Sequence, residues 1–358
     1  MRLNLSRRQL MAAAAFTPFA VQAQGSVQKL RFGIATKVIS PIVINCVIPE
    51  ILGYYREEGI SIETIPLGSN AAVMGSVQSG RIEFGVGVPS FQIPLVGKGD
   101  ALPARNFYEY TYPFKWGVAV MPGSPIKSLA ELKGKRVGVS SVGQSDYPVG
   151  QSVFRVMGMD PDKDVSWLSV GEGVTAGEAL RRGAIDGLFY YDTGFGTIEA
   201  AGIEMRYLPM PSNVPKVGGL YLSATEATLA THRKWAVGFG RGVAKASVFT
   251  LENPTAAAVA FIQMYPEAAP KGMSMAEQIK AIQNPIEKRA KLFTSYDKTD
   301  PRWGHVTPNE WNEEIEFAGL KGKAGDPGSY FTNDLIAEIN DFSADKIREQ
   351  ARNYRMPA

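Results

Sequence analysis

From residue 29 to residue 88, short apolar runs of strand length alternate with stretches in which apolar residues recur at helical spacing. The runs lie at about 29–36, 60–67 and 82–88, and the helical stretches at about 41–57 and 70–79. Strands that alternate with helices favour a parallel sheet with helices packed on its faces. The pattern therefore predicts a first α/β unit.

A second series of the same kind follows a polar-aromatic extended stretch at 102–112, a predicted strand at 115–121 and the turn Pro122-Gly-Ser-Pro125. Its strands are expected at 135–140, 165–170 and 187–191, and its helices at 148–157 and 176–181. Short helical and strand pieces follow at 195–201 and 203–208, and a further strand is expected at 219–223. From Thr225 onward the pattern is helical to the end, so helices cover one of the two units.

The two series are also similar in sequence. Lys29-Leu-Arg-Phe-Gly-Ile-Ala-Thr36 matches Gly134-Lys-Arg-Val-Gly-Val-Ser-Ser141, with an arginine and a glycine at the same places. Gly80-Arg-Ile-Glu-Phe84 matches Gly183-Ala-Ile-Asp-Gly187, and between these pairs 62–68 and 165–171 are both apolar runs that end in glycine. Three segments that recur in the same order indicate a duplicated unit, although a common helix-to-strand junction could also recur by chance.

Two similar α/β units in one chain predict two lobes with a cleft between them. The simplest arrangement has lobe one as 24–115 plus 208–358 and lobe two as 116–207, joined by two crossings near 113–117 and 207–217. Open α/β sheets bind ligands at the carboxyl ends of their parallel strands, so we expect a ligand site in this cleft.

Residues 1–23 have the pattern of an export signal. Arg7 and Arg8 precede an uncharged run, 10–21, that is too short to span a bilayer as a helix, and Val21-Gln-Ala23 predicts cleavage after Ala23. Ser6-Arg-Arg-Gln-Leu10 resembles in part the twin-arginine motif of proteins that are exported folded. The twin-arginine and general secretory routes both remain open.

Composition excludes several classes of function. The signal holds three of the 38 basic residues, so 35 remain against 35 acidic ones, and a neutral chain gives no reason to expect a nucleic-acid surface. Cys46 is the only cysteine, so no internal disulfide is possible. The two histidines, His232 and His305, lie far apart in sequence, and we expect no metal site and no cofactor.

The segment 123–139, Gly-Ser-Pro-Ile-Lys-Ser-Leu-Ala-Glu-Leu-Lys-Gly-Lys-Arg-Val-Gly-Val, resembles the entry to the second lobe of periplasmic substrate-binding proteins of ABC importers. The resemblance is to the nitrate, sulfonate and taurine group with its thiamine-precursor-binding relatives. Three further segments are similar to that group: Glu57-Glu-Gly-Ile-Ser-Ile62, Ser79-Gly-Arg-Ile-Glu-Phe84, and Arg182-Gly-Ala-Ile-Asp-Gly187. These motifs belong to the scaffold, so they indicate the kind of protein and not its solute.

The resemblance implies the two-lobed type II periplasmic binding fold, in which each lobe is a mainly parallel five-stranded sheet flanked by helices, here with a helical C-terminal extension. It implies a monomeric, periplasmic protein without enzymatic activity that closes on a small organic solute, such as a sulfonate, a carboxylate or a nitrogen heterocycle. An ABC permease in the inner membrane would then receive the solute. Two alternatives stay open: an enzyme similar to the thiamine-pyrimidine synthases, and a sensor subunit that presents a ligand to a membrane kinase. The known synthases use a cysteine-rich motif, and this chain has only Cys46.

A small solute in a dry cleft needs polar groups that point inward and small residues that leave space, and both are expected just after the predicted strands. Helix N-termini there also suit a negatively charged group. The candidates are Thr36, Lys37, Ser40, Ser69, Asn70, Ser90, Trp116, Ser141, Gln144, Glu172, Tyr191 and Asp192.

Several candidates have an ordinary structural role as their alternative. Ser69 and Asn70 could cap a helix that begins at Ala71, and Trp116 could belong to the core. Glu172 and Asp192 would oppose an unaccompanied anion and would suit an amine, an amide or a protonated heterocycle. Lys37 would suit an anion, so the sequence leaves the charge of the solute open.

Overall fold

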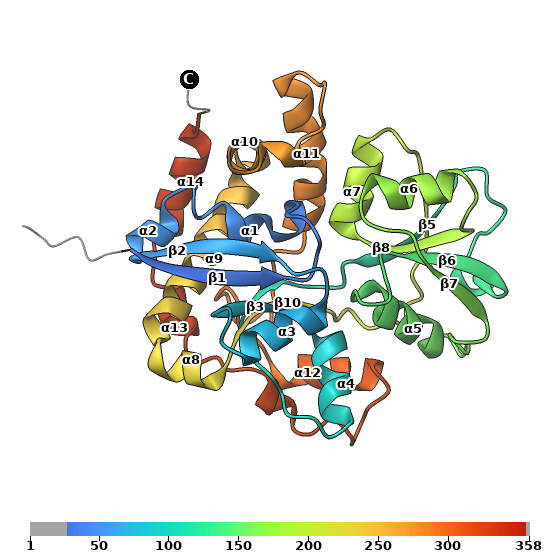
Figure 1. The fold of residues 1–358 in the computed structure, drawn as a ribbon, viewed down its shortest axis with the longest axis horizontal. Helices are drawn as coiled ribbons and strands as arrows, with labels where there is room; N and C mark the ends of the chain where they lie inside the picture. The colour runs from blue at the N-terminus through green and yellow to red at the C-terminus, as the bar shows by residue number, and fades with distance from the viewer. Residues whose placement is uncertain (1–26, 356–358) are drawn as a thin grey trace, which may run out of the picture.

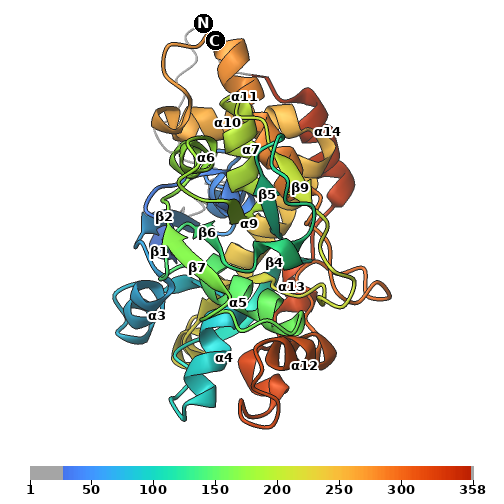
Figure 2. The same cartoon turned by 90° about the vertical axis from the view of Figure 1, so that its right-hand side faces the viewer.

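Two five-stranded sheets, one in each lobe, form the frame of the molecule (Figure 1). The computed structural model describes residues 27–355, and the predicted export signal at 1–23 lies outside them. The first lobe contains the sheet β2-β1-β3-β10-β4 and the second the sheet β7-β6-β8-β5-β9. Figure 2 looks along the long axis of the molecule with the second lobe in front.

The strands are β1 (Gln28–Ile34), β2 (Ile60–Pro66), β3 (Phe84–Gly87), β4 (Arg105–Thr111), β5 (Trp116–Val120), β6 (Lys135–Val139), β7 (Val165–Ser169), β8 (Gly187–Tyr191), β9 (Arg206–Leu208) and β10 (Leu220–Ala224). The helices up to the second crossing are α1 (Ile44–Val47), α2 (Tyr54–Glu57), α3 (Asn70–Gln78), α4 (Pro89–Gly97), α5 (Asp146–Val156), α6 (Val174–Arg181) and α7 (Asp192–Ala200). The C-terminal helices are α8 (Glu226–Thr231), α9 (Arg233–Glu252), α10 (Pro254–Met264), α11 (Met275–Ala290), α12 (Pro308–Phe317), α13 (Ile336–Ile339) and α14 (Ala344–Asn353).

The two sheets have the same topology and the same register. In the first sheet β1 pairs in parallel with β2 and β3, and β10 runs antiparallel to β3 and β4. In the second, β6 pairs in parallel with β7 and β8, and β5 runs antiparallel to β8 and β9. Each sheet is therefore mixed and contains a single antiparallel strand, β10 in the first and β5 in the second. Along the chain, each of these two strands directly follows a crossing between the lobes.

The sequence repeat is also a structural repeat. The backbone N–H and the guanidinium of Arg31 both donate to the carboxylate of Glu83, and Arg136 donates in the same way to Asp186. A Cβ at the repeated glycine would lie 2.5 Å from Ile82 Cδ1 in the first lobe and 2.4 Å from Ile185 Cδ1 in the second. Glycine is needed there because the isoleucine of the next repeated segment fills the space.

The chain crosses between the sheets twice, at 112–115 and at 209–219. The helices after β10 pack mainly on the first lobe, but α11 also packs against α7 of the second (Figure 1). The C-terminal extension therefore touches both lobes.

Local signals set several helix starts. Ser69 Oγ accepts from the N–H of Ala72, and Ser274 forms a capping box with Glu277.

The structure confirms the predicted fold class, including the helical extension. The expected helix at 41–57 is instead a 3-10 turn at Pro41–Val43 followed by the short helices α1 and α2. Pro49, with Gly53 at a positive φ of 82°, lies between these helices and prevents a continuous one. Within residues 27–355, no helix has both the length and the apolar character needed to cross a membrane.

Candidate functional site

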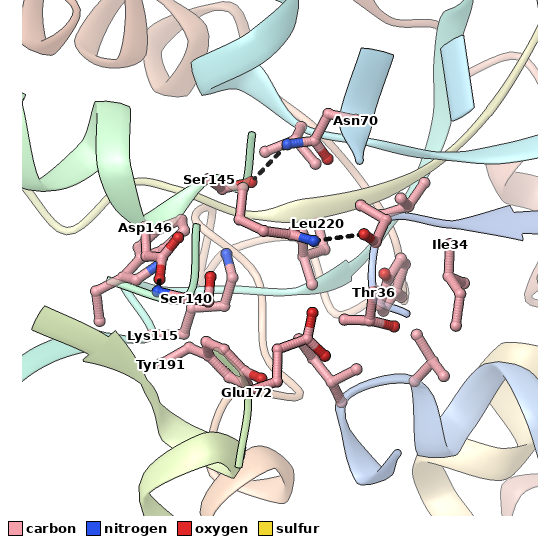
Figure 3. Close-up of a pocket in the computed structure, with 18 residues that line it drawn as sticks. Ile34, Thr36, Asn70, Lys115, Ser140, Ser145, Asp146, Glu172, Tyr191 and Leu220 are labelled. Carbon is pink, nitrogen blue, oxygen red and sulfur yellow. Dashed lines mark hydrogen bonds between the residues drawn. The ribbon is translucent and has the colours of Figure 1, made fainter. Parts of the chain in front are cut away.

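A cavity of about 60 Å³, called here the inner pocket, lies between the lobes at the carboxyl ends of their parallel strands (Figure 3). Lys115 of the first crossing borders it. Its lining consists of Ile34, Ala35, Thr36, Ile42, Val43, Asn70, Val86, Val88, Tyr110, Lys115, Trp116, Ser140, Gln144, Ser145, Asp146, Glu172, Tyr191 and Leu220. This is the place where open α/β sheets bind ligands.

In both lobes, a turn at a glycine connects the end of a strand to the residues that line the pocket. Gly68 follows β2 with φ 78°, and Gly171 follows β7 with φ 84°, a conformation that other residues adopt at a cost. Asn70 begins the helix two residues after Gly68, and Glu172 comes directly after Gly171. The turns therefore place an amide from one lobe and a carboxyl group from the other beside the same cavity.

Hydrogen bonds connect the lobes around the pocket. Gln144 Nε2, from the loop after β6, donates to the backbone carbonyls of Ala35 and Gly68 in the first lobe. Asn70 Nδ2 donates to Ser145 Oγ at 3.1 Å. The buried Asn70 Oδ1 and Tyr110 hydroxyl have no hydrogen-bond partner within the described residues, so both can still bond to a solute.

Two carboxyl groups border the pocket from the second lobe. Burial raises the pKa of Glu172. The backbone N–H of Lys37, which donates to the Glu172 carboxylate, and the positive charge of Lys37 both lower this pKa, but burial outweighs them. Burial likewise raises the pKa of Asp146 to about 6, although Ser140 and Tyr147 donate backbone N–H groups to its carboxylate. Both groups are acceptors when ionised, and Figure 3 shows the Glu172 carboxyl group on the pocket side.

Lys115 is the basic side chain in the lining. Its Nζ donates to the carbonyl of Gly218 at 2.6 Å and lies 3.5 Å from the centre of the Trp116 ring. Burial, followed by repulsion from Arg289, lowers the pKa of Lys115 well below its ordinary value. Lys115 is therefore a poor partner for a bound anion.

The structure brings six of the sequence candidates to the inner pocket: Thr36, Asn70, Trp116, Gln144, Glu172 and Tyr191. Trp116 also packs in the core of the second lobe, where Gly218 leaves room for its ring.

The other six candidates lie elsewhere. Ser40 borders a neighbouring hollow, Ser90 lines a third cavity behind Trp116, and Ser69 caps α3. Lys37 is exposed, and Ser141 accepts from the N–H of Gln144 in the loop after β6. Asp192 is bound by the fully buried Arg289, with contacts of 2.8 Å and 2.6 Å.

Sequence reasoning missed Tyr110, Lys115 and Asp146 in this lining, whereas Ser140 and Ser145 bound the segment after β6 that the sequence indicated. Lys115 directly precedes β5, whereas most of the sequence candidates lie at strand ends. A lysine inside a crossing between lobes is the signal that could have identified it. Within the part of the chain that the structure describes, no group of three or more histidine, cysteine, aspartate or glutamate side chains is arranged to hold a metal ion.

Residues 41–257 match the model of the family described as NMT1/THI5 like. This match covers more than half of the chain. The chain belongs to this family.

One curated relative is the 4-amino-5-hydroxymethyl-2-methylpyrimidine phosphate synthase of Legionella pneumophila, 26% identical over 157 residues, which are 44% of this chain and 46% of the synthase. The match thus spans about half the length of that relative. Among solved structures, a protein of Bordetella bronchiseptica RB50 is similar with a TM-score of 0.63 and 20% identity over 92% of this chain and 99% of its own. The periplasmic aliphatic sulphonate binding protein SsuA of Escherichia coli has a TM-score of 0.62 and 16% identity over 87% of this chain and 99% of its own. At these identities the structural matches show the shared fold.

Proposed function

We propose that this protein is an extracytoplasmic solute-binding protein that closes on a small nitrogen heterocycle and delivers it to an ABC permease. The observation that carries the proposal is the inner pocket, to which both lobes contribute polar side chains at the carboxyl ends of their strands. The fold shared with a periplasmic binding protein supports it. The proposal includes cleavage after Ala23, a periplasmic location and action as a monomer.

The charges of the lining favour a heterocycle over a sulfonate or a carboxylate. Glu172 and Asp146 border the pocket, and Lys115, the basic group there, is already bonded to Gly218. A protonated ring nitrogen or an amino substituent can donate to the Glu172 carboxylate, whereas an anion would be repelled by that carboxylate. Trp116 and Tyr191 offer aromatic surfaces for a flat ring.

We further propose that the lobes, 24–115 plus 208–358 and 116–207, close by bending at the two crossings. A solute that touches both lobes stabilises the closed arrangement, because it contacts both lobes only when they are together. The bonds from Gln144 and Asn70 already connect the lobes across the pocket. Small-angle scattering should therefore show a smaller radius of gyration with the solute than without it.

An enzyme is the second candidate, because the curated relative is named a synthase. Cys46, the only thiol of the chain, is fully buried in the first-lobe core, outside the pocket lining. Burial raises its pKa well above the ordinary value, so the reactive thiolate is disfavoured. The burial of this cysteine and its place outside the lining favour the carrier over the enzyme.

A thermal-shift screen with aminopyrimidines, imidazoles, alkanesulfonates and carboxylates tests the proposal. Specific binding raises the melting temperature by mass action, and we expect the heterocycles to do so and the alkanesulfonates to have no effect. Stabilisation by sulfonates alone would overturn the charge argument. Mass spectrometry after long incubation separates carrier from enzyme: the heterocycle should be recovered unchanged, and conversion to a product would overturn the carrier function.

A further inference from the structure

A second and larger hollow, called here the outer chamber, adjoins the inner pocket. Its volume is about 620 Å³, against about 60 Å³ for the inner pocket. Glu172 and Tyr191 line both cavities, so the two cavities adjoin at these side chains. Figure 3 shows the two side chains next to each other at the edge of the inner pocket.

The walls of the outer chamber are mainly apolar and come from both lobes. Val38 follows β1, Val174 begins α6, and Met273 precedes α11. These three side chains are 58%, 40% and 41% exposed, and so belong to the few large apolar residues that the described surface leaves open. Apolar groups that meet around one hollow mark a place where apolar surface is covered on binding.

The charge of the outer chamber matches that of the inner pocket. Its charged lining residues are Glu172 and Glu267, and no lysine or arginine borders it among the described residues. An anionic group in the outer chamber would therefore meet two carboxyl groups and no basic side chain of the lining. The chamber suits an uncharged apolar chain.

Size separates the roles of the two cavities. Pockets that bury whole small-molecule ligands have volumes of roughly 300–1,000 Å³, so the inner pocket at about 60 Å³ holds only a compact group, whereas the outer chamber lies within the range. The polar acceptors are concentrated at the small cavity and the apolar surface at the large one. Each cavity thus fits one part of a two-part molecule.

We infer that the inner pocket and the outer chamber form one continuous site for a solute with a compact nitrogen-heterocyclic head and an apolar tail of several carbons. This inference rests on the proposed function, because it takes the heterocycle as the head. The head lies against Glu172 and Asn70, and the tail passes Tyr191 and covers the apolar residues of the chamber.

Calorimetric titration with 1-methylimidazole and 1-hexylimidazole tests the inference, since the two share a head and differ only in the tail. Burial of the additional methylene groups should make 1-hexylimidazole bind roughly 10- to 100-fold more tightly. Ala281 on α11 lines the chamber, and Ala281→Trp would fill part of it. This substitution should remove most of the advantage of the hexyl chain.

Ala276→Trp is the matched control, because Ala276 is an exposed residue of the same helix outside the chamber lining. It should keep the full preference for the hexyl chain, and the melting temperatures of both variants show that they are folded. Equal affinities for the two imidazoles in the wild-type protein would overturn the continuous site and leave the proposed function intact. Absence of binding by both would overturn the heterocyclic head and, with it, this inference.

Discussion

The two lobes share a frame and differ at the cleft. Arg31 and Glu83 in the first lobe correspond to Arg136 and Asp186 in the second, with the same hydrogen bonds and the same strand register. At the strand ends the repeats diverge: the first lobe has Ala35, Ser69 and Pro89 where the second has Ser140, Glu172 and Asp192. The frame has stayed symmetric, while the second lobe has become the polar and acidic side of the site.

The C-terminal extension makes the asymmetry larger, because it is present once and its buried arginine forms an ion pair with only one of the two equivalent helix starts. Arg289 of α11 binds Asp192, the first residue of α7, whereas the equivalent position of the first lobe is Pro89, the first residue of α4. Arg289 also donates to the carbonyl of Ile42 at 2.8 Å. A single buried arginine thus joins both lobes behind the cleft.

The largest effect should come from breaking this asymmetric ion pair. Asp192→Asn leaves the Arg289 guanidinium buried without its counter-charge, and the loss of one partner of a buried pair costs about 3–5 kcal/mol. Urea unfolding should show the loss as a lower free energy of unfolding. Asp345→Asn, which breaks the exposed pair with Arg348, is the control and should leave stability unchanged within error.

The same comparison explains which parts of the structure the sequence could predict. Strand alternation and the two repeats come from local patterns, so they predicted both sheets and the location of the cleft between them. The pair of Asp192 and Arg289 joins residues 97 positions apart, and no local pattern connects them, so Asp192 was assigned to the ligand instead. Lys115 was missed for a related reason: its burial depends on Trp116 and Gly218, which meet only after both crossings form.

A second effect of the extension should be visible as a dependence on pH. Glu314 of α12 accepts from the N–H of Gly218 in the second crossing, and burial, followed by repulsion from Glu310, raises its pKa to about 8. Glu109, Glu313 and Lys115 also face this group.

The folded protein therefore keeps a proton on Glu314 that the unfolded chain loses above its ordinary pKa of 4.5. Stability from this group is complete below that pH and falls as pH rises towards 8, by about 1.4 kcal/mol per unit. In Glu314→Gln the free energy of unfolding should decline less steeply between pH 5 and 8. Parallel curves for the two proteins would contradict the assignment.

The symmetry of the frame can be tested with a pair of equivalent substitutions. Gly33→Ala and Gly138→Ala each place a Cβ against an isoleucine Cδ1, at 2.5 Å and 2.4 Å, and overpacking of this kind costs about 1–3 kcal/mol. We expect the two losses in the free energy of unfolding to be similar. Gly75→Ala in α3 is the control, because its Cβ would meet nothing within 4 Å, and it should stabilise the protein slightly.

The smallest effect should come from the repeated surface ion pairs, for which Glu83→Gln and Asp186→Asn are the equivalent substitutions. Burial opposes ionisation of Glu83, but the bonds from Arg31 outweigh it and lower its pKa, and the side chain of Arg136 lowers the pKa of Asp186. Each carboxylate therefore stabilises the folded state above its unfolded pKa, and this contribution is lost as pH falls through the lower folded value. Because all four side chains are partly exposed, both variants should lose less at pH 7 than the glycine variants, and by similar amounts. The difference from wild type should vanish in acid for both lobes, and a loss confined to one lobe would show that the frame, like the cleft, has diverged.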